Sequence, residues 1–410
     1  MTELAVVRAR MQGLAKAARA VLVERDQEIE TAVIALLARA NHLQLGPPGT
    51  GKSYLATTMT SLVDGTKYYE TLITGQSLEE QLYGPISLKG MEEDRYLRKT
   101  AGYLPEADIA FIDEFYRGSG PILNANLWIL NERKFHNDGQ VYSIPLITLY
   151  AAANDGPTDP DLAAIHDRMD FKHVVNPITT EDGFLTMINR SIDPPTIEPV
   201  IDVATLREAH GYVDAITIAE DCKKALTKIW KELGSKGIHP SDRKFVNAIR
   251  MARASAFLGG RAEAEASDLS ILVHALWNEA EERADVMKVV LKHANPIDRE
   301  AANVLENLKG LSAQVEDAVK HDSRAVRVRK TLNLIQKLEL VGTEIDAVSA
   351  RAKKAGIASK RIGEARRQLT AYSRKLIREG FEYTGDINKF NQDDIHKIVA
   401  SLQGAGPESG

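Results

Sequence analysis

The sequence predicts an α/β fold with a parallel sheet core, followed by an all-α domain and a C-terminal helical, coiled-coil-like arm. Short apolar runs alternate with amphipathic stretches from residue 41 to about 155, as in successive βαβ units. Residues 200–285 show a helical pattern throughout. From residue 295 to about 400, apolar residues recur three and four positions apart, as in coiled coils.

Size and composition suit a protein of two or three domains. The chain has 410 residues, of which 44% are hydrophobic, and a net charge of −5 that gives no general attraction to nucleic acid or membranes. Its single cysteine, Cys222, excludes an intrachain disulfide and argues against a cysteine-ligated metal. The sequence contains no bilayer-spanning apolar run and no signal-peptide core. We therefore expect a cytoplasmic protein without membrane insertion.

The domain boundaries are predicted from changes in pattern. The first 40 residues are helical and belong to the α/β domain, and a proline-rich linker follows that domain. The expected parts are residues 1–190 (α/β domain), 191–290 (helical domain), 291–403 (helical hairpin or three-helix arm) and 404–410 (disordered tail).

A phosphate-binding loop follows the first predicted strand, His42–Leu45. The pattern G-x-x-x-x-G-K-[ST] is matched at every fixed position, which happens by chance in only ~1–2% of chains this long. Glycine N–H groups cradle phosphates, the lysine reaches the β and γ phosphates, and the serine hydroxyl holds Mg²⁺. The predicted nucleotide-binding residues here are Gly46, Pro47, Pro48, Gly49, Thr50, Gly51, Lys52, Ser53 and Tyr54. A helix over 53–62 adds its positive end to the cradle.

Two further apolar runs end in polar residues. Ile109–Ile112 is a predicted buried strand that leads into Asp113 and Glu114, a carboxylate for Mg²⁺ and a general base for water. By themselves these two residues read better as a solvated acidic turn; the phosphate loop upstream favours the catalytic interpretation. Ile147–Ala153 leads into Asn154, which can hydrogen-bond the attacking water or can simply begin a turn. The residues alone favour neither interpretation of Asn154.

In combination these motifs resemble the MoxR branch of the AAA+ ATPases, most closely the RavA type. The resemblance covers roughly residues 5–285. It rests on the segments Gly46–Ser53, Tyr83–Ser87, Gly102–Ala107, Asp113–Phe115, Leu130–Phe135, Ala153–Asn154 and His166–Met169. It implies a nucleotide domain, a small helical lid and a ring, usually a hexamer, with ATP sites between subunits.

The resemblance also implies roles for single residues. Lys52 and Ser53 match Walker A, Asp113 and Glu114 match Walker B, and Asn154 matches sensor 1. Arg168 matches the arginine finger, which reaches the γ phosphate of a neighbouring subunit; the alternative is a surface arginine at a helix end. Arg243 matches sensor 2, with Ser241 or Asp242 as the helix cap. An arginine in a first helical turn opposes the helix dipole, which is easier to explain if it serves a phosphate. Arg117 and Arg133 rank below Arg168 as candidates.

The resemblance also bears on two loops and one helix. In related proteins an insert that fits Gly84–Gly102, and the hairpin at 135–141 with its turn at 137–139, face the pore or one end of the ring; the alternative is two solvated hairpins. Residues 23–29 lie where related proteins pack a helix against the adenine base. We interpret Ile29 as core rather than as a base contact.

The C-terminal arm carries a basic run between Arg351 and Arg378, with ten basic residues and one acidic residue. We rank a solvated helix face first, an acidic protein partner second and nucleic acid third. RavA-type proteins carry an extra small domain in the helical region after the lid, and the absence of a β-rich insert here puts the partner of that domain in doubt. Three apolar stripes define the arm: Val304, Leu308, Leu311, Val315 and Ala318; Leu334, Leu338, Val341, Ile345 and Val348; Ile362, Ala365, Leu369, Tyr372 and Leu376.

The functional expectation is a ring-forming ATPase that uses ATP and Mg²⁺ to remodel a partner protein. The resemblance suggests a von Willebrand factor A-domain protein as adaptor. One alternative is a nucleic-acid-acting ring, helicase- or clamp-loader-like, that uses the basic arm. Another is a nucleotide-gated scaffold that hydrolyses ATP slowly.

Overall fold

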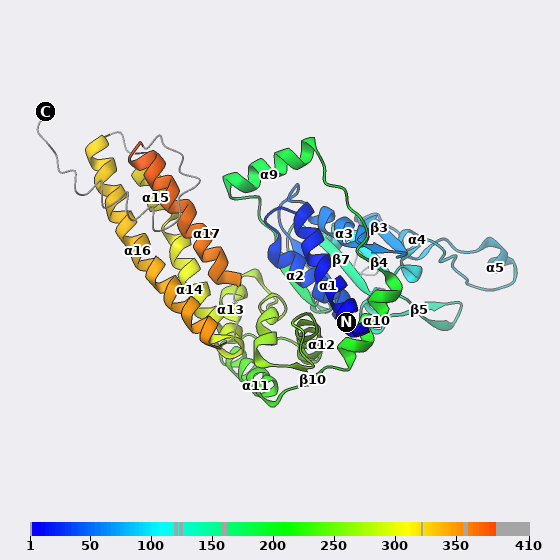
Figure 1. The fold of residues 1–410 in the computed structure, drawn as a ribbon. Helices are drawn as coiled ribbons and strands as arrows, with labels where there is room; N and C mark the ends of the chain where they lie inside the picture. Colours follow the sequence, from blue (N-terminus) through cyan, green and yellow to red (C-terminus); the bar gives the residue numbers. More distant parts are fainter. Residues whose placement is uncertain are drawn as a thin grey trace, which may run out of the picture. The chain divides into compact units, whose positions relative to one another are not determined.

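The computed structural model describes residues 2–118, 122, 126–157, 159, 162–320, 323–355 and 360–382 (Figure 1). The chain divides into two compact units, Met1–Ala294 and Asn295–Gly410. Among the helices of the described ranges, none combines the length and the apolar character needed to cross a bilayer.

The core of the first unit is a five-stranded parallel sheet in the order β3-β4-β7-β1-β8. The three strands predicted from the sequence are confirmed, and β3 and β8 complete the sheet. Both neighbours of β1 pair with it from its first residue, because His42 is opposite Tyr150 on β7 and Phe171 on β8. The strands are β1 (His42–Leu45), β3 (Tyr68–Leu72), β4 (Ile109–Asp113), β7 (Thr148–Ala153) and β8 (Phe171–Val174).

Helices bury both faces of this sheet, so β4 and β7 are almost continuously apolar and all four residues of β1 are buried. The first 40 residues form α1 (Glu3–Val21) and α2 (Asp26–Ala38), as predicted. Nine of the thirteen residues of α2 are buried, and the side chains of Thr148 and Tyr150 donate to α2 carbonyls. Further helices of this part are α3 (Lys52–Ser61), α7 (Leu127–Glu132), α8 (Ala163–Asp167) and α9 (Glu181–Ile192), with 3₁₀ turns η1 (Leu104–Glu106) and η2 (Phe115–Arg117).

Because all five strands are parallel, the sheet has two chemically different edges. The loops that follow β1, β4 and β7 lie at the C-terminal edge, where open α/β sheets bind ligands. Asn41, just before β1, and the turn from α8 into β8 lie at the N-terminal edge, where the Phe171 N–H donates to the Asn41 carbonyl. The 4 residues of β1 separate the two edges by roughly 13 Å, at ~3.3 Å per residue.

The helical domain follows, but the prediction of helix throughout residues 200–285 is wrong in detail. Three two-residue strands interrupt it: β9 (Ile201–Asp202) pairs with β2 (Val63–Asp64), and β10 (Thr217–Ile218) pairs with β11 (Glu263–Ala264). Runs this short show no alternation in the sequence, and the packed helices bring them together. The helices are α10 (Val203–Asp214), α11 (Glu220–Ser235), α12 (Asp242–Leu258) and α13 (Arg283–Ala294), with 3₁₀ helices η4 (Ala266–His274) and η5 (Ala280–Glu282).

The insert and the hairpin project from the same side of the first unit (Figure 1). The insert contains α5 (Leu88–Glu92) and follows α4 (Glu79–Tyr83); the hairpin is β5 (Lys134–Asn137) and β6 (Gln140–Ser143). The hairpin is confirmed, with Asp138 and Gly139 at φ 52° and 71° as a two-residue turn of type I′ requires. Asn137 Oδ1 accepts the Arg98 N–H at 2.8 Å, and Asn137 Nδ2 donates to the Arg98 carbonyl at 3.1 Å. These two hydrogen bonds connect the hairpin to the insert.

The second unit is a helical bundle whose core is made by the three predicted stripes. Leu308, Leu338 and Leu369, one from each stripe, are buried in a single apolar cluster. The helices are α14 (Pro296–Gly310), α15 (Ser312–Val319), α16 (Arg324–Ala355) and α17 (Lys360–Lys375), followed by a π-helical turn η6 (Leu376–Gly380). The first stripe therefore spans two helices that meet at Leu311. The predicted tail at 404–410 lies outside the described residues.

Part of the basic run holds this bundle together. Among the described side chains of this run, at least four basic residues form ion pairs with carboxylates on other helices of the bundle. Their charges are therefore compensated within the unit, which reduces the field available to nucleic acid phosphates. The pairs are Arg351 with Glu300, Arg361 with Asp298, Arg366 with Asp346, and Lys375 with Glu316.

Candidate functional site

The phosphate loop connects β1 to the N-terminus of α3. Gly46 is confined because a Cβ there would lie 2.3 Å from the Val175 carbonyl oxygen, and Gly51 precedes the helix at φ 80°, in the left-handed region. The Lys52 Nζ donates to the carbonyls of Gly46 at 2.6 Å and Pro47 at 2.9 Å. Two carbonyls of the phosphate loop therefore hold the Lys52 ammonium in place.

Two carboxylates and an amide lie at the same edge of the sheet. Asp113 ends β4, and its Oδ1 accepts the N–H of Glu114 at 2.8 Å. Glu114 has φ 52° and ψ 41°, a left-handed conformation that costs a non-glycine residue about 1–3 kcal/mol and is concentrated at functional sites. Asn154, directly after β7, donates from Nδ2 to Glu114 Oε1 at 3.1 Å. The backbone strain at Glu114 thus aims its carboxylate toward Asn154.

Electrostatics connect Lys52 to this acidic pair. Burial lowers the pKa of the Lys52 ammonium, whereas the charges of Asp113 and Glu114 act in the opposite direction. The sequence-predicted residues Lys52, Asp113, Glu114 and Asn154 therefore form one cluster at the C-terminal edge.

The residues present fit a nucleotide-bound Mg²⁺. The ion takes oxygen ligands, usually a carboxylate or hydroxyl together with substrate phosphates. Ser53, in the first turn of α3, is exposed, and Asp113 is only half-buried. Tyr54 is 46% exposed on the same turn, and its predicted nucleotide contact stays a prediction.

Arg168, the predicted arginine finger, and Arg243, the predicted sensor 2 residue, lie together, away from the phosphate loop. Arg243 Nη1 pairs with Asp167 Oδ2 at 2.9 Å, and the Ser241 hydroxyl donates to the same oxygen at 2.9 Å. Arg168 follows Asp167; burial lowers the pKa of its guanidinium, and the neighbouring charge of Arg243 lowers it further. Ser241 also caps α12 by accepting the N–H of Lys244, as predicted.

This arginine pair, Arg168 and Arg243, lies at the N-terminal edge of the sheet. The carbonyl of Arg168 accepts a hydrogen bond from Asn41 Nδ2 at 3.0 Å, and Asn41 directly precedes β1. Farther along α12, Asn247 donates to Asp170, the residue before β8, at 2.7 Å. The length of β1 therefore separates the arginine pair from the phosphate loop of the same chain.

Arg133 and Arg117, the two lower-ranked arginines, bind groups of their own chain. The Arg133 guanidinium donates to the carbonyls of Ile129, Leu130, Arg39 and Ile147 and to Asn41 Oδ1, which makes it a structural residue. Burial lowers its pKa to about 10. Arg117 pairs through Nε with Glu114 Oε2 at 3.0 Å in its own chain.

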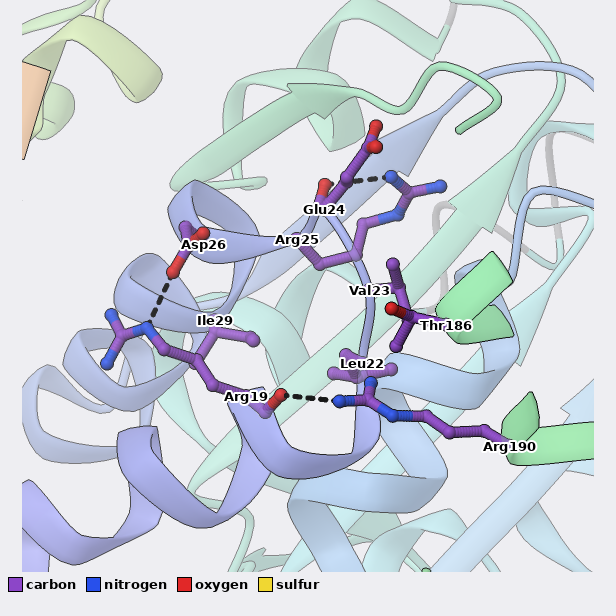
Figure 2. Close-up of a pocket in the computed structure, with 9 residues that line it drawn as sticks. All are labelled: Arg19, Leu22, Val23, Glu24, Arg25, Asp26, Ile29, Thr186 and Arg190. Atoms are coloured by element: carbon purple, nitrogen blue, oxygen red, sulfur yellow. Dashed lines mark hydrogen bonds and ion pairs between the residues drawn. The ribbon is translucent and has the colours of Figure 1, made fainter. Parts of the chain in front are cut away.

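A cavity of about 230 Å³ lies beside the phosphate loop, between the α1–α2 connection and α9 (Figure 2). Arg25 lines it and donates to the Thr50 carbonyl of the loop at 2.9 Å. Across the cavity Thr186 and Arg190 of α9 face Leu22 and Val23 (Figure 2). Ile29 is fully buried but also lines the cavity, so its interpretation as core rather than as a base contact stays a prediction.

Three residues of this arrangement escaped the sequence analysis: Asp167, Arg25 and Arg190. Asp167 was visible only as the middle of His166-Asp167-Arg168, and nothing in the sequence pairs it with Arg243. Arg25, at the N-cap of α2, and Arg190, in the last turn of α9, belong to no motif, and Arg190 is fixed by donating to the Val21 carbonyl at 2.9 Å. No local pattern distinguishes such arginines from surface residues.

Fold and site together define an AAA+ ATPase, and comparisons with known proteins agree. Residues 9–189 match the model of the MoxR domain in the MoxR-vWA-beta-propeller ternary systems, and residues 221–290 match an AAA lid domain. Two uncharacterized proteins of Methanocaldococcus jannaschii are 35% and 32% identical over 335 residues, which is 80% of this chain and 88% and 87% of theirs. The chain belongs to the MoxR family of AAA+ ATPases.

More distant similarities agree with the fold. A structural protein of Acidianus two-tailed virus is 28% identical over 225 residues, which is 50% of this chain and 36% of that protein. The crystal structure of a candidate ATPase from Cytophaga hutchinsonii superposes with a TM-score of 0.59 at 17% identity, over 71% of this chain and 96% of that one.

Proposed function

We propose that this protein hydrolyses ATP as a homo-oligomeric ring, a hexamer by family resemblance, in which each site is completed by the neighbouring subunit. The observation that carries the proposal is the placement of Arg168 and Arg243 at the edge of the sheet opposite Lys52 and Glu114. Within one chain the arginine pair has no route to the γ phosphate. In a head-to-tail ring, the N-terminal edge of one subunit meets the C-terminal edge of the next.

In the proposed reaction Lys52 leaves its loop carbonyls for the β and γ phosphates. Ser53 and Asp113 would hold a Mg²⁺ ion, which would supply positive charge to the phosphates. Glu114 takes a proton from the attacking water, while Asn154 orients the Glu114 carboxylate. The neighbour's Arg168 and Arg243 stabilise the charge on the transferred phosphoryl group. The cavity at Arg25 and Arg190 receives the base.

The proposal predicts that ATP turnover per subunit rises steeply with protein concentration. An isolated subunit lacks the arginine pair, and loss of an arginine finger costs about 10³–10⁵-fold in rate. Phosphate release measured across the concentration range of assembly, followed in parallel by light scattering, tests this. Turnover per subunit that stays constant down to monomer would contradict a shared site.

The remodelled partner is proposed from the family. The matching domain model is named for systems that combine MoxR with a vWA protein and a β-propeller, which supports a vWA-domain adaptor and a protein substrate for this cytoplasmic ATPase. We also propose that the protein is of the RavA type within the MoxR family. Chromatography of a tagged chain with ATP is expected to co-purify a vWA-domain protein, and a Lys52→Ala chain to retain less of it. Equal recovery with both chains would argue that the adaptor does not depend on the ATP-bound ring.

A further inference from the structure

Helix α9 is turned with its polar side toward its own chain and its apolar side toward solvent. Gly183 is its one buried residue, and Thr186 and Arg190 on the same side face the cavity beside the phosphate loop (Figure 2). At 100° per residue Phe184, Leu185, Ile188 and Ile192 fall on the other side of the helix, and Met187 lies at the border between the two sides. Their exposed fractions are Phe184 52%, Leu185 50%, Met187 41%, Ile188 36% and Ile192 77%.

This apolar stripe, residues 184, 185, 187, 188 and 192, is unusual for a helix of a soluble unit. Normally the apolar side of a surface helix faces the core, and contiguous exposed apolar patches mark interaction sites. The stripe lies on the helix that forms one wall of the proposed nucleotide cavity. A partner that covers the stripe therefore contacts the helix whose other side faces the cavity.

A complementary surface lies beside the arginine pair. A cleft of about 480 Å³ opens between α11 and the start of α12, lined by Trp230, Ile238 and Pro240 among others. Trp230 is 54% exposed although it is the largest side chain of α11. Asp242 also lines the cleft and directly precedes Arg243. The cleft therefore lies beside Arg243, the residue that enters the neighbouring site in the proposed ring.

We propose that the apolar stripe of α9 on one subunit docks into the Trp230 cleft of the next subunit. This rests on the shared site proposed above and names the contact that aligns it. The stripe borders the half of the site with the phosphate loop, and the cleft borders the half with the arginines, so one docking event joins both halves. The two surfaces differ and repeat head to tail, as a ring requires.

Charge also favours a second copy of this chain as the occupant. The first turn of α9 carries exposed Glu181 and Asp182 next to the stripe. The exposed face of α11 beside the cleft carries Lys224, Lys228 and Lys231. Opposite charges at the rim of an apolar contact steer the approach and fix the register.

Disulfide trapping tests the contact directly. Cys222 is the chain's only cysteine; it is buried, and burial raises its pKa to about 11, so it is unreactive. We expect Ile188→Cys chains mixed with Trp230→Cys chains to form a disulfide-linked dimer of unlike chains with a slowly hydrolysed ATP analogue. The matched control pairs Ile188→Cys with Val141→Cys. Val141 lies on the hairpin and is as exposed as Trp230, the residue that it replaces in the pair. A yield for 188–230 no higher than for 188–141 overturns the proposal.

A second measurement separates this contact from the shared site itself. We expect Ile188→Asp to weaken assembly by at least tenfold in concentration, while the monomer still binds a fluorescent ATP analogue. Asn189→Asp, exposed on α9 but outside the stripe, is expected to assemble normally. Normal assembly of Ile188→Asp refutes the docking proposal. The proposal is also refuted if Ile188→Asp assembles normally and its only defect is that it no longer floats with anionic vesicles. If instead 188–230 trapping succeeds but Arg168→Ala keeps full turnover, the shared-site chemistry fails and the docking contact stands.

Discussion

A one-to-one mixture of Lys52→Ala chains and Arg168→Ala chains is expected to hydrolyse ATP although neither variant does so alone. Each pure variant has the same defect in every site of its ring. In a mixed ring, an intact site forms wherever the phosphate loop of an Arg168→Ala chain meets the arginine of a Lys52→Ala chain. Random mixing in a head-to-tail ring gives about a quarter of all interfaces this composition. Phosphate release from pre-mixed, co-assembled chains measures the recovery.

The edges of the sheet supply matched controls for this experiment. Lys52→Ala mixed with Glu114→Gln should stay inactive, because both changes lie at the C-terminal edge. Every subunit of the mixed ring then has a defective C-terminal edge, so no interface forms an intact site. Arg168→Ala mixed with Arg243→Ala should also stay inactive, because both changes lie at the N-terminal edge. Recovery in this last mixture would mean that Arg243 serves the nucleotide of its own subunit. No recovery in the Lys52 and Arg168 mixture, despite normal assembly, would place the whole site in one chain.

The half of the site with the phosphate loop could be predicted from the sequence because its geometry is local. The strands that end in Asp113 and Ala153 are apolar runs with a polar residue at or directly after their ends, and the strand that ends in Leu45 leads directly into the glycine-containing phosphate loop. Parallel strands of one sheet bring those ends to one edge, so the motif spacing predicts the cluster. The strain at Glu114 was not predictable, since no sequence rule places a glutamate in a left-handed conformation.

The other half depends on long-range packing that patterns do not encode. Arg168 and Arg243 were assigned by resemblance, yet their shared partner Asp167 and their place at the far edge emerge only from α12 packing beside the α8–β8 turn. The same limit applies to the bundle. Helical periodicity identified its apolar stripes, but it could not show that Arg361 of the basic run pairs with Asp298 on another helix.

The second large effect is expected at Glu114. Glu114→Gln should lower ATP turnover by about 10²–10⁴-fold, the usual contribution of a general base, because an amide cannot accept the proton of water. Nucleotide affinity should be unchanged, since Lys52 and the phosphate loop remain intact. Single-turnover phosphate release, with affinity from a fluorescent ATP analogue, separates the two. If a ring with this variant still supports partner function in full, a nucleotide-gated scaffold replaces the motor.

A glycine at the same position distinguishes chemistry from structure. The left-handed conformation of Glu114 is costly for any side chain and free for glycine, so Glu114→Gly should unfold at an equal or higher temperature than the natural chain. Its turnover should nevertheless fall at least as far as that of Glu114→Gln. A fold that gains stability while losing turnover would show that the strain persists for catalysis. Loss of stability in Glu114→Gly would instead show that contacts with Asn154 and Arg117 hold the fold, and that the turnover defect is indirect.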